Sequence, residues 1–331
     1  MLIEANPYKV FAGSKGGALA KRICEYLGCE QGKVNIEHFS DGEFAVAFEE
    51  TVRGISVYLV QSTCPSTDNL MELLLMIDAA RRASAYKVIA VIPYFGWARQ
   101  DRKDKPRVSI GAKLCATMIQ AAGADRVITL DLHADQIQGF FDIPVDHLFA
   151  SNVFAEYIAS LGLKDLVVAS PDEGGTKRSL KLCKNLQKKL KEEVPMVICY
   201  KQRLKANMVS EIRVLGDIEG KDVVLCDDIC DTAGTLCKAA AIIKQNGAKS
   251  VRAVISHGVL SGPAIERIEN SVLEELIITD SIEFDQSRCS KIKVLNTEAI
   301  FGKVITAIQT HTSISESLYK PLAGLPAKGS A

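Results

Sequence analysis

The 331-residue sequence lacks any excess of charge of one sign, because 40 Lys and Arg residues balance 40 Asp and Glu residues. Proteins that hold nucleic acid or an acidic membrane surface by their overall field carry a basic surplus, so we expect neither partner. No uncharged apolar run reaches the ~18 residues of a membrane-spanning helix. Residues 1–17 also lack the pattern of a signal peptide, so we expect a cytoplasmic protein.

Cysteine pairs of the kind that form disulfide or metal sites are missing. The ten cysteines include no CxxC pair and lie mostly within apolar segments, as Cys115 and Cys199 do. This distribution is typical of small buried hydrophobic residues in a reducing compartment. A zinc site made by Cys226, Cys230 and Cys237 is the alternative, although their spacing fits no common closed zinc site.

Two common nucleotide-binding motifs are absent as well. The chain contains no GxxxxGK[ST] sequence, since the nearest approach, GCEQGKV, has the wrong spacing and lacks the hydroxyl residue. No GxGxxG sequence follows a predicted strand either. A nucleotide that binds to this protein must therefore bind by another route.

What the sequence does contain is an alternation of short apolar runs with longer segments of helical period. The runs are YKVFA, SVYLVQ, KVIAVIPY, RVITLDL, DLVVAS, PMVICY, DVVLC, VRAVIS, ELIIT and KIKVL. Their continuous apolarity is typical of strands buried on both faces. In the helical segment 179–193, one side carries Leu180, Cys183, Leu186 and Leu190, with lysines opposite. The alternation predicts an α/β fold with mainly parallel sheets flanked by helices.

The length predicts two domains of ~150 residues each. A faint internal repeat supports this division, because five residues of segment 85–92 recur in segment 248–255, displaced by 163 positions. We expect an N-terminal domain over residues 1–150, in which the loop QSTCPSTDN is a degenerate copy of a phosphate loop. A C-terminal domain over residues 151–320 and a frayed tail over residues 321–331 follow.

The stretch VVLCDDICDTAGTL, residues 223–236, ends an apolar run in three carboxylates and a turn of small residues. Backbone N–H groups and hydroxyls of residues 232–235 at a helix N-terminus can hold a phosphate without Lys or Arg. Asp227 and Asp231 are suited to accept hydrogen bonds from neighbouring sugar hydroxyls, or to face Mg²⁺. An acidic turn that only caps a helix is the alternative. A phosphorylated sugar would satisfy both halves of the loop.

Other polar residues follow strands or interrupt the apolar pattern. His133, in TLDLHADQ, and Asp172, in SPDEGG, come just after strands and suit a ligand role, although each residue type is more often structural in such a place. By default the run ARQDRKDK would be a solvated face, SDGE a hairpin tip and KQRLKANMVSE a basic surface loop.

On these motifs the sequence resembles the ribose-phosphate pyrophosphokinase family. VVLCDDICDTAGT is similar to a signature that this family shares with phosphoribosyltransferases, whereas FSDGE, NLMELLLMIDAARRASA, VIPYFGWARQDRKDK, TLDLHADQIQGFFDIPVD, SPDEGG and SHGVLSGPAI resemble this family in particular. The resemblance implies two tandem phosphoribosyltransferase-like domains. It also implies that the diphosphoryl group of ATP moves to the C1 hydroxyl of ribose 5-phosphate, giving phosphoribosyl pyrophosphate and AMP for nucleotide biosynthesis.

The resemblance further implies roles for single residues. Lys201 and Arg203 would be catalytic, on a loop that closes over the substrates, and His133 and Asp172 would bind Mg²⁺. ATP would be bound by Asp41, Gly42, Glu43, Arg99, Gln100 and His133. Ribose 5-phosphate would be bound by Arg203, Asp227, Asp231, Thr232, Ala233, Gly234 and Thr235.

Assembly and regulation are implied in the same way. In the family the SDGE hairpin reaches a neighbouring subunit's active site, so we expect an oligomer, and a homohexamer is typical. Inorganic phosphate is the expected activator and ADP the expected inhibitor. Arg53, Arg107 and Ser313 to Ser315 lie in regions that resemble the regulatory site.

Two alternatives and one departure remain. A phosphoribosyltransferase would need neither an ATP site nor a second domain, and a non-catalytic regulatory relative would be expected to show a damaged loop at Lys201 and Arg203. Ala233 stands where many members have Gly. If its φ were positive, it would cost about 1 kcal/mol.

Overall fold

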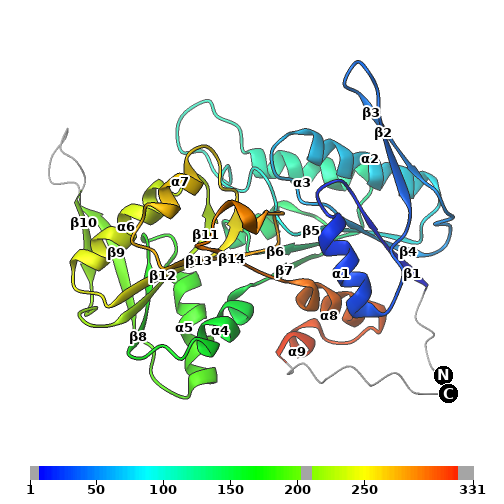
Figure 1. Ribbon diagram of the computed structural model, residues 1–331. Helices are drawn as coiled ribbons and strands as arrows, with labels where there is room; N and C mark the ends of the chain where they lie inside the picture. Colours follow the sequence, from blue (N-terminus) through cyan, green and yellow to red (C-terminus); the bar gives the residue numbers. More distant parts are fainter. Residues whose placement is uncertain (1–6, 203–210, 320–331) are drawn as a thin grey trace, which may run out of the picture.

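Two sheets of mainly parallel strands form the frame of the protein in the computed structural model, which describes residues 7–202 and 211–319 (Figure 1). The first sheet is entirely parallel, in the order β1-β4-β5-β6-β7. Its strands are β1 (Tyr8–Ala12), β4 (Ser56–Val60), β5 (Lys87–Ile92), β6 (Arg126–Leu130) and β7 (Val145–Leu148). All residues of β4 are buried, which is why its apolar run is unbroken.

The second sheet has the order β10-β9-β8-β11-β12-β13-β14, with only the β9–β10 pair antiparallel. Its strands are β8 (Leu166–Ser170), β9 (Met196–Gln202), β10 (Glu211–Leu215), β11 (Asp222–Cys230), β12 (Ser250–Gly258), β13 (Glu275–Thr279) and β14 (Ile292–Leu295). The run β8-β11-β12-β13-β14 repeats the strand order of the first sheet. The segments of the internal repeat therefore occupy equivalent strands, β5 and β12.

Each apolar run predicted as a strand forms one, the two large sheets contain two further strands, and one predicted strand end is wrong. β7 and β10 have no counterpart among the predicted strands, because VDHL and EIRVL mix polar with apolar residues. The run DVVLC predicts a strand that ends at Cys226, before the carboxylates, and this end is wrong. β11 continues to Cys230, because β12 stays paired with it as far as Gly258.

The helices cover the sheets, and α5 overlaps the predicted helical segment 179–193. They are α1 (Gly17–Leu27), α2 (Asp68–Arg82), α3 (Gly111–Ala122), α4 (Ser151–Ser160), α5 (Thr176–Leu190), α6 (Gly234–Gln245), α7 (Ala264–Glu269), α8 (Glu298–Gln309) and α9 (Ile314–Tyr319), with 3-10 turns η1 (Asp135–Phe140) and η2 (Gln286–Arg288). In α5 the predicted apolar face is wrong in one place: Leu180 is exposed, and Leu182 is buried beside Cys183 and Leu186. No helix in the described ranges is long and apolar enough to cross a membrane.

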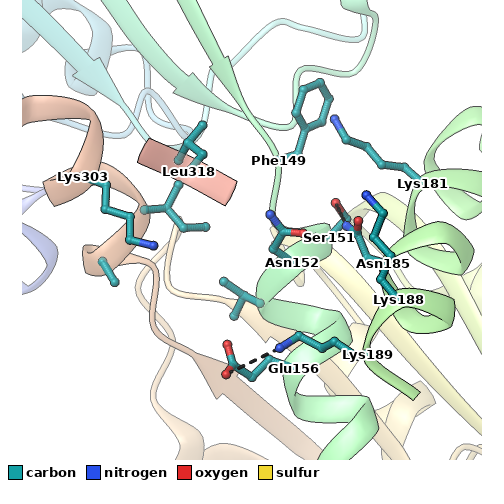
Figure 2. A pocket seen from close by; sticks show the side chains of 13 residues that line it. Phe149, Ser151, Asn152, Glu156, Lys181, Asn185, Lys188, Lys189, Lys303 and Leu318 are labelled. Carbon is teal, nitrogen blue, oxygen red and sulfur yellow. Dashed lines mark hydrogen bonds and ion pairs between the residues drawn. The ribbon is translucent and has the colours of Figure 1, made fainter. Parts of the chain in front are cut away.

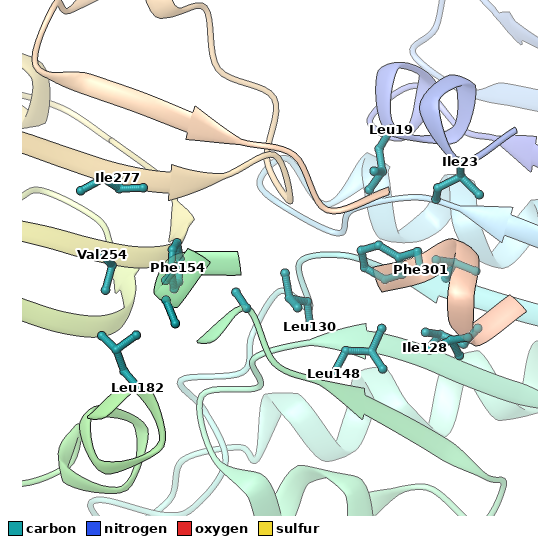
Figure 3. Close-up of a cluster of buried hydrophobic side chains, with 14 of the residues drawn as sticks. Leu19, Ile23, Ile128, Leu130, Leu148, Phe154, Leu182, Val254, Ile277 and Phe301 are labelled. Atoms are coloured by element: carbon teal, nitrogen blue, oxygen red, sulfur yellow. The ribbon is translucent and has the colours of Figure 1, made fainter. Parts of the chain in front are cut away.

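The two halves of the chain share a hydrophobic core (Figure 3). One buried cluster joins Leu19 and Ile128 of the first half to Leu182 and Ile277 of the second. Phe301 of α8 belongs to the same cluster, because α8 returns to pack against α1 (Figure 1). The predicted boundary between residues 150 and 151 falls between β7 and α4, but it stays a prediction, since packing continues across it.

Candidate active site

The carboxyl ends of β6 and β12 meet between the two sheets. His257 Nε2, on β12, lies 3.1 Å from the carbonyl oxygens of both Leu130 and Asp131, so this nitrogen carries the proton. Ser256 Oγ donates to Asp131 Oδ2 at 2.5 Å. Burial lowers the pKa of His257, in keeping with a neutral ring. Since ligands of parallel sheets bind at the carboxyl ends of strands, this seam is where a site is expected.

His133, Asp228 and Arg178 form a polar cluster on the same seam. His133 Nδ1 lies 2.7 Å from Asp228 Oδ2, and Arg178 Nη1 lies 3.2 Å from Asp228 Oδ1. Asp228 is only 4 % exposed, so its charge depends on these partners. Burial acts to raise the pKa of Asp228, but the His133 hydrogen bond and the Arg178 charge outweigh it and hold that pKa below its usual range. The same hydrogen bond raises the pKa of His133.

Asp227 lies beside this cluster with its side chain partly exposed. Its Oδ1 is 3.5 Å from Arg178 Nη1. Burial, and then the charge of Asp228, raises the pKa of Asp227. A carboxyl of this kind can accept or donate a hydrogen bond to a hydroxyl, which suits a sugar ligand.

Asp231 connects the acidic loop to a residue of the other half of the chain. Arg99 Nη1 lies 2.8 Å from Asp231 Oδ2, and Ser261 Oγ donates to Asp231 Oδ1. The hydrogen bonds from Ser261 and Arg99 lower the pKa of Asp231. A residue predicted to bind ATP therefore contacts a residue predicted to bind the sugar.

In the turn after Asp231, the backbone φ angle of Ala233 is positive. Ala233 has φ +58° and ψ 2°, in the left-handed region, immediately before α6 begins at Gly234. The hydroxyl residues Thr232 and Thr235 are exposed on either side. Arg267 of α7 donates to the carbonyl oxygen of Thr232 at 2.9 Å. The loop itself carries no cation, but α7 places one beside it.

Of the other predicted ATP residues, Gln100 lies near His133 and Arg99, whereas three belong to a hairpin. A cavity of about 560 Å³ is lined by Arg99, Gln100 and His133 together with other residues of the loop after β5. The predicted hairpin tip is confirmed: Asp41, Gly42 and Glu43 join β2 (Val34–His38) to β3 (Phe44–Phe48), and the hairpin projects from the body (Figure 1). Gly42 has φ +96°, a conformation that favours glycine in this turn.

The predicted catalytic residues fall at the edge of what the structure describes. Lys201 belongs to β9, near its carboxyl end, and its side chain lies outside the described residues. Arg203 lies outside them altogether. Because β9 runs parallel to β8, Lys201 lies at the same edge of the sheet as Asp172.

The described residues contain no closed metal cage around the predicted Mg²⁺ ligands His133 and Asp172. In the described parts of the chain, no three His, Cys, Asp or Glu side chains are grouped to hold a metal, and this includes Cys226, Cys230 and Cys237. His133 turns Nδ1 to a carboxylate, which leaves Nε2 for a ligand, as in many metal-binding histidines. Asp172 Oδ1 accepts from Gly175 N at 3.0 Å, and its carboxylate is exposed. Such an ion would take further oxygens from phosphate and water.

Three residues of the site were given no role from the sequence. Asp228, Arg178 and Arg267 all contact the acidic loop, yet only Asp228 lies within it. Arg178 follows SPDEGG by only a few residues, and Arg267 follows SGPAI in the same way. Arg178 and Arg267 could have been found as basic residues in helices that begin at or just after a recognised motif.

Two mainly parallel sheets, with an acidic loop and a histidine between them, define an α/β protein that has a phosphoribosyltransferase-like fold. Residues 8–123 match the family model described as the N-terminal domain of ribose phosphate pyrophosphokinase, and residues 170–320 match a phosphoribosyl synthetase-associated domain. The chain belongs to the ribose-phosphate pyrophosphokinase family.

Close relatives cover nearly the whole chain. The ribose-phosphate pyrophosphokinase of Porphyromonas gingivalis is 58 % identical over 95 % of this chain and 98 % of its own length. That of Chlorobaculum tepidum is 49 % identical over 94 % of each chain. The crystal structure of phosphoribosylpyrophosphate synthetase from Mycobacterium smegmatis superimposes with a TM-score of 0.84 at 36 % identity, over 91 % of this chain and 98 % of that one.

These relatives confirm the predicted family, the fold class and the enzyme activity. The activity is that of a ribose-phosphate diphosphokinase, a transferase that makes phosphoribosyl pyrophosphate for nucleotide biosynthesis.

Proposed function

We propose that the seam between the two sheets is where ATP and ribose 5-phosphate meet, and that the C1 hydroxyl of the sugar attacks the β-phosphorus of ATP there. The observation that carries this is the contact between Arg99 and Asp231, at 2.8 Å. These residues come from the two halves of the chain and from the two predicted substrate sites. The sugar end and the nucleotide end are thus within reach of each other.

On the sugar side, the turn before α6 takes the 5-phosphate. Its backbone N–H groups and the hydroxyls of Thr232 and Thr235 are the donors. Asp227 and Asp231 accept hydrogen bonds from the ring hydroxyls. The 5-phosphate needs no cation within the loop, because helix N-terminal amides, with Arg267 nearby, already favour an anion.

On the nucleotide side, Arg99 and Gln100 contact ATP, and His133 and Asp172 hold Mg²⁺. Bound Mg²⁺ would neutralise charge on the ATP phosphates. The chain's own residues orient the reactants: Arg99 binds phosphate oxygens with its guanidinium, and Asp228 fixes the ring of His133. Transfer of this kind depends on positioning and charge neutralisation more than on covalent catalysis.

Lys201 and Arg203 supply positive charge to the transferred diphosphoryl group. The family resemblance supports this assignment, and so does the position of β9 beside β8. Replacing Lys201 with Ala should lower kcat by about 100-fold or more, while the KM for ATP changes less.

The test measures AMP release with and without ribose 5-phosphate, in the presence of Mg²⁺ and inorganic phosphate. Lys293→Ala, at an exposed position of β14, serves as the control and should keep wild-type turnover. Unchanged turnover in Lys201→Ala would refute the assignment. If the wild-type protein forms no AMP, a non-catalytic regulatory role is favoured instead.

We also propose a cytoplasmic homohexamer in which the hairpin tip of one subunit reaches the ATP site of another. The projecting hairpin and the 45 % exposure of Phe39 at its tip support this. Asp41, Gly42 and Glu43 would then contact the adenine of a neighbouring subunit. Two measurements on the wild-type protein and on a variant that lacks residues 39–43 test it. In sedimentation both proteins should be oligomers. In an ATP-binding measurement the variant should lose affinity.

Activation by inorganic phosphate has a supporting feature in a lysine-rich cavity of about 510 Å³ between α4, α5 and α8 (Figure 2). Lys181 and Lys188 of α5 and Lys303 of α8 line it. Burial lowers the pKa of Lys181 to about 8, so an anion there would stabilise its charge. Leu318 of α9 borders the cavity, close in sequence to Ser313 and Ser315. Loss of phosphate activation in Lys181→Gln would support this role, and unchanged activation would oppose it.

A further inference from the structure

Arg178, in the first turn of α5, contacts the adjacent carboxyls of Asp227 and Asp228, the acidic pair, and the segment after β6 that carries His133. Its Nη1 lies 3.2 Å from Asp228 Oδ1 and 3.5 Å from Asp227 Oδ1. Its Nη2 donates to the carbonyl oxygen of Leu132 at 3.5 Å. The Arg178 side chain is only 17 % exposed, so little water competes for these contacts.

The acceptors of Arg178 come from different sheets. Asp227 and Asp228 belong to β11 of the second sheet, and Leu132 follows β6 of the first. His133 also joins this hydrogen-bond network, because its Nδ1 lies 2.7 Å from Asp228 Oδ2. A rigid, planar guanidinium among these groups fixes the distance between Asp227, on the sugar side, and His133, on the ATP side.

The preceding residues are anchored across the same seam. His257 holds the carbonyl oxygens of Leu130 and Asp131, and Ser256 holds the Asp131 carboxylate. Those contacts fix where the strand end lies. Arg178 adds the connection from this strand end to the acidic pair itself.

We propose that Arg178 is a positioning residue of the diphosphoryl transfer, which aligns Asp227, on the sugar side, with His133, on the ATP side, across the interface between the sheets. Its two Nη atoms contact three protein oxygens, those of Asp228, Asp227 and Leu132, so we assign it a role that acts through these groups. The proposal rests on the roles proposed above for His133 and Asp227.

The experiment compares Arg178→Gln and Arg178→Lys with Lys177→Gln, the exposed neighbour on the same helical turn. For Arg178→Gln we expect kcat to fall about 10- to 100-fold, as for other residues that orient a ligand-binding histidine. The KM for ribose 5-phosphate should rise more than the KM for ATP. Arg178→Lys should recover part of kcat but not all of it, and Lys177→Gln should match wild type.

A double variant tests whether Arg178 acts through His133. If it does, Arg178→Gln should lower kcat much less in a His133→Asn background than in wild type. Equal losses in the two backgrounds, or wild-type kinetics in a folded Arg178→Gln enzyme, would overturn the proposal. Should Arg178→Gln fail to fold, wild-type kcat and KM in Arg178→Lys would overturn it equally. Full activity in His133→Asn alone would instead refute the assignment of His133 to the site.

Discussion

Asp228→Asn should destabilise the protein by an amount that depends on pH. The substitution removes a buried charge that lies 3.2 Å from Arg178 and 2.7 Å from His133. Breaking a buried ion pair costs ~3–5 kcal/mol, but Arg178 keeps Asp227 at 3.5 Å as a second partner. We therefore expect the loss of the Arg178 contact to cost about 2 kcal/mol, below that range.

The contribution of His133 adds the pH dependence. The pKa of Asp228 is lowered, so its stabilising effect is present above pH ~4 and is lost on acidification. The pKa of His133 is raised by its hydrogen bond to Asp228, so its share is complete below pH ~6.5 and disappears as the pH rises through the raised pKa. Since the His133 side chain is 39 % exposed, this share is about 1 kcal/mol or less.

The cost of Asp228→Asn should therefore be about 3 kcal/mol near pH 6 and about 2 kcal/mol at pH 9. If the whole chain unfolds as one unit, the loss at pH 6 lowers Tm by about 4 °C. Calorimetry and urea unfolding at both pH values measure the difference. Asp78→Asn, in an exposed pair with Arg82 on α2, is the control and should not change Tm. Equal losses at pH 6 and pH 9, or a loss below about 1 kcal/mol at pH 6, would refute the reasoning.

Three further substitutions test the acidic loop. Ala233→Val should destabilise the protein by about 2 kcal/mol and weaken ribose 5-phosphate binding, since a β-branched residue fits poorly at φ +58°. Ala233→Gly is the control, and an Ala233→Val protein that unfolds at the wild-type midpoint would contradict this. Arg267→Gln should raise the KM for ribose 5-phosphate several-fold with little change in kcat, because the hydrogen bond to Thr232 is lost; an unchanged KM in steady-state kinetics would remove Arg267 from the site. Arg99→Ala should raise the KM for ATP about tenfold, and a larger effect on ribose 5-phosphate than on ATP would reverse the assignment of Arg99.

The sequence predicted the architecture well where one physical cause dominates. Strands such as β5 and β12 are buried on both faces, so their residues form continuous apolar runs. The edge strands β7 and β10 have no such constraint, and the pattern missed them. The apolar face of α5 failed at Leu180 for a related reason: Leu182 satisfies the helical period equally well, and only the packing against the sheet decides between the two.

The candidate site was predictable as a set of motifs but not as a set of contacts. Asp231 could be found in its loop, and Arg99 in its charged run, but no local pattern shows that they meet. Arg178 was missed because its partners, Asp228 and Leu132, lie far from it along the chain. The positive φ of Ala233 was the exception, since the small-residue turn itself raised the question.

The packing of α8 against α1 has a consequence for how the protein is made. Phe301 completes a cluster with Leu19 and Ile23, and Gln309 donates to the buried hydroxyl of Tyr58 at 2.7 Å. During synthesis, the first sheet gains these contacts only after the whole second sheet has been made. A nascent chain that stops before α8 leaves the side of α1 that packs on α8 uncovered, so folding of the N-terminal half depends on a helix that follows the second sheet.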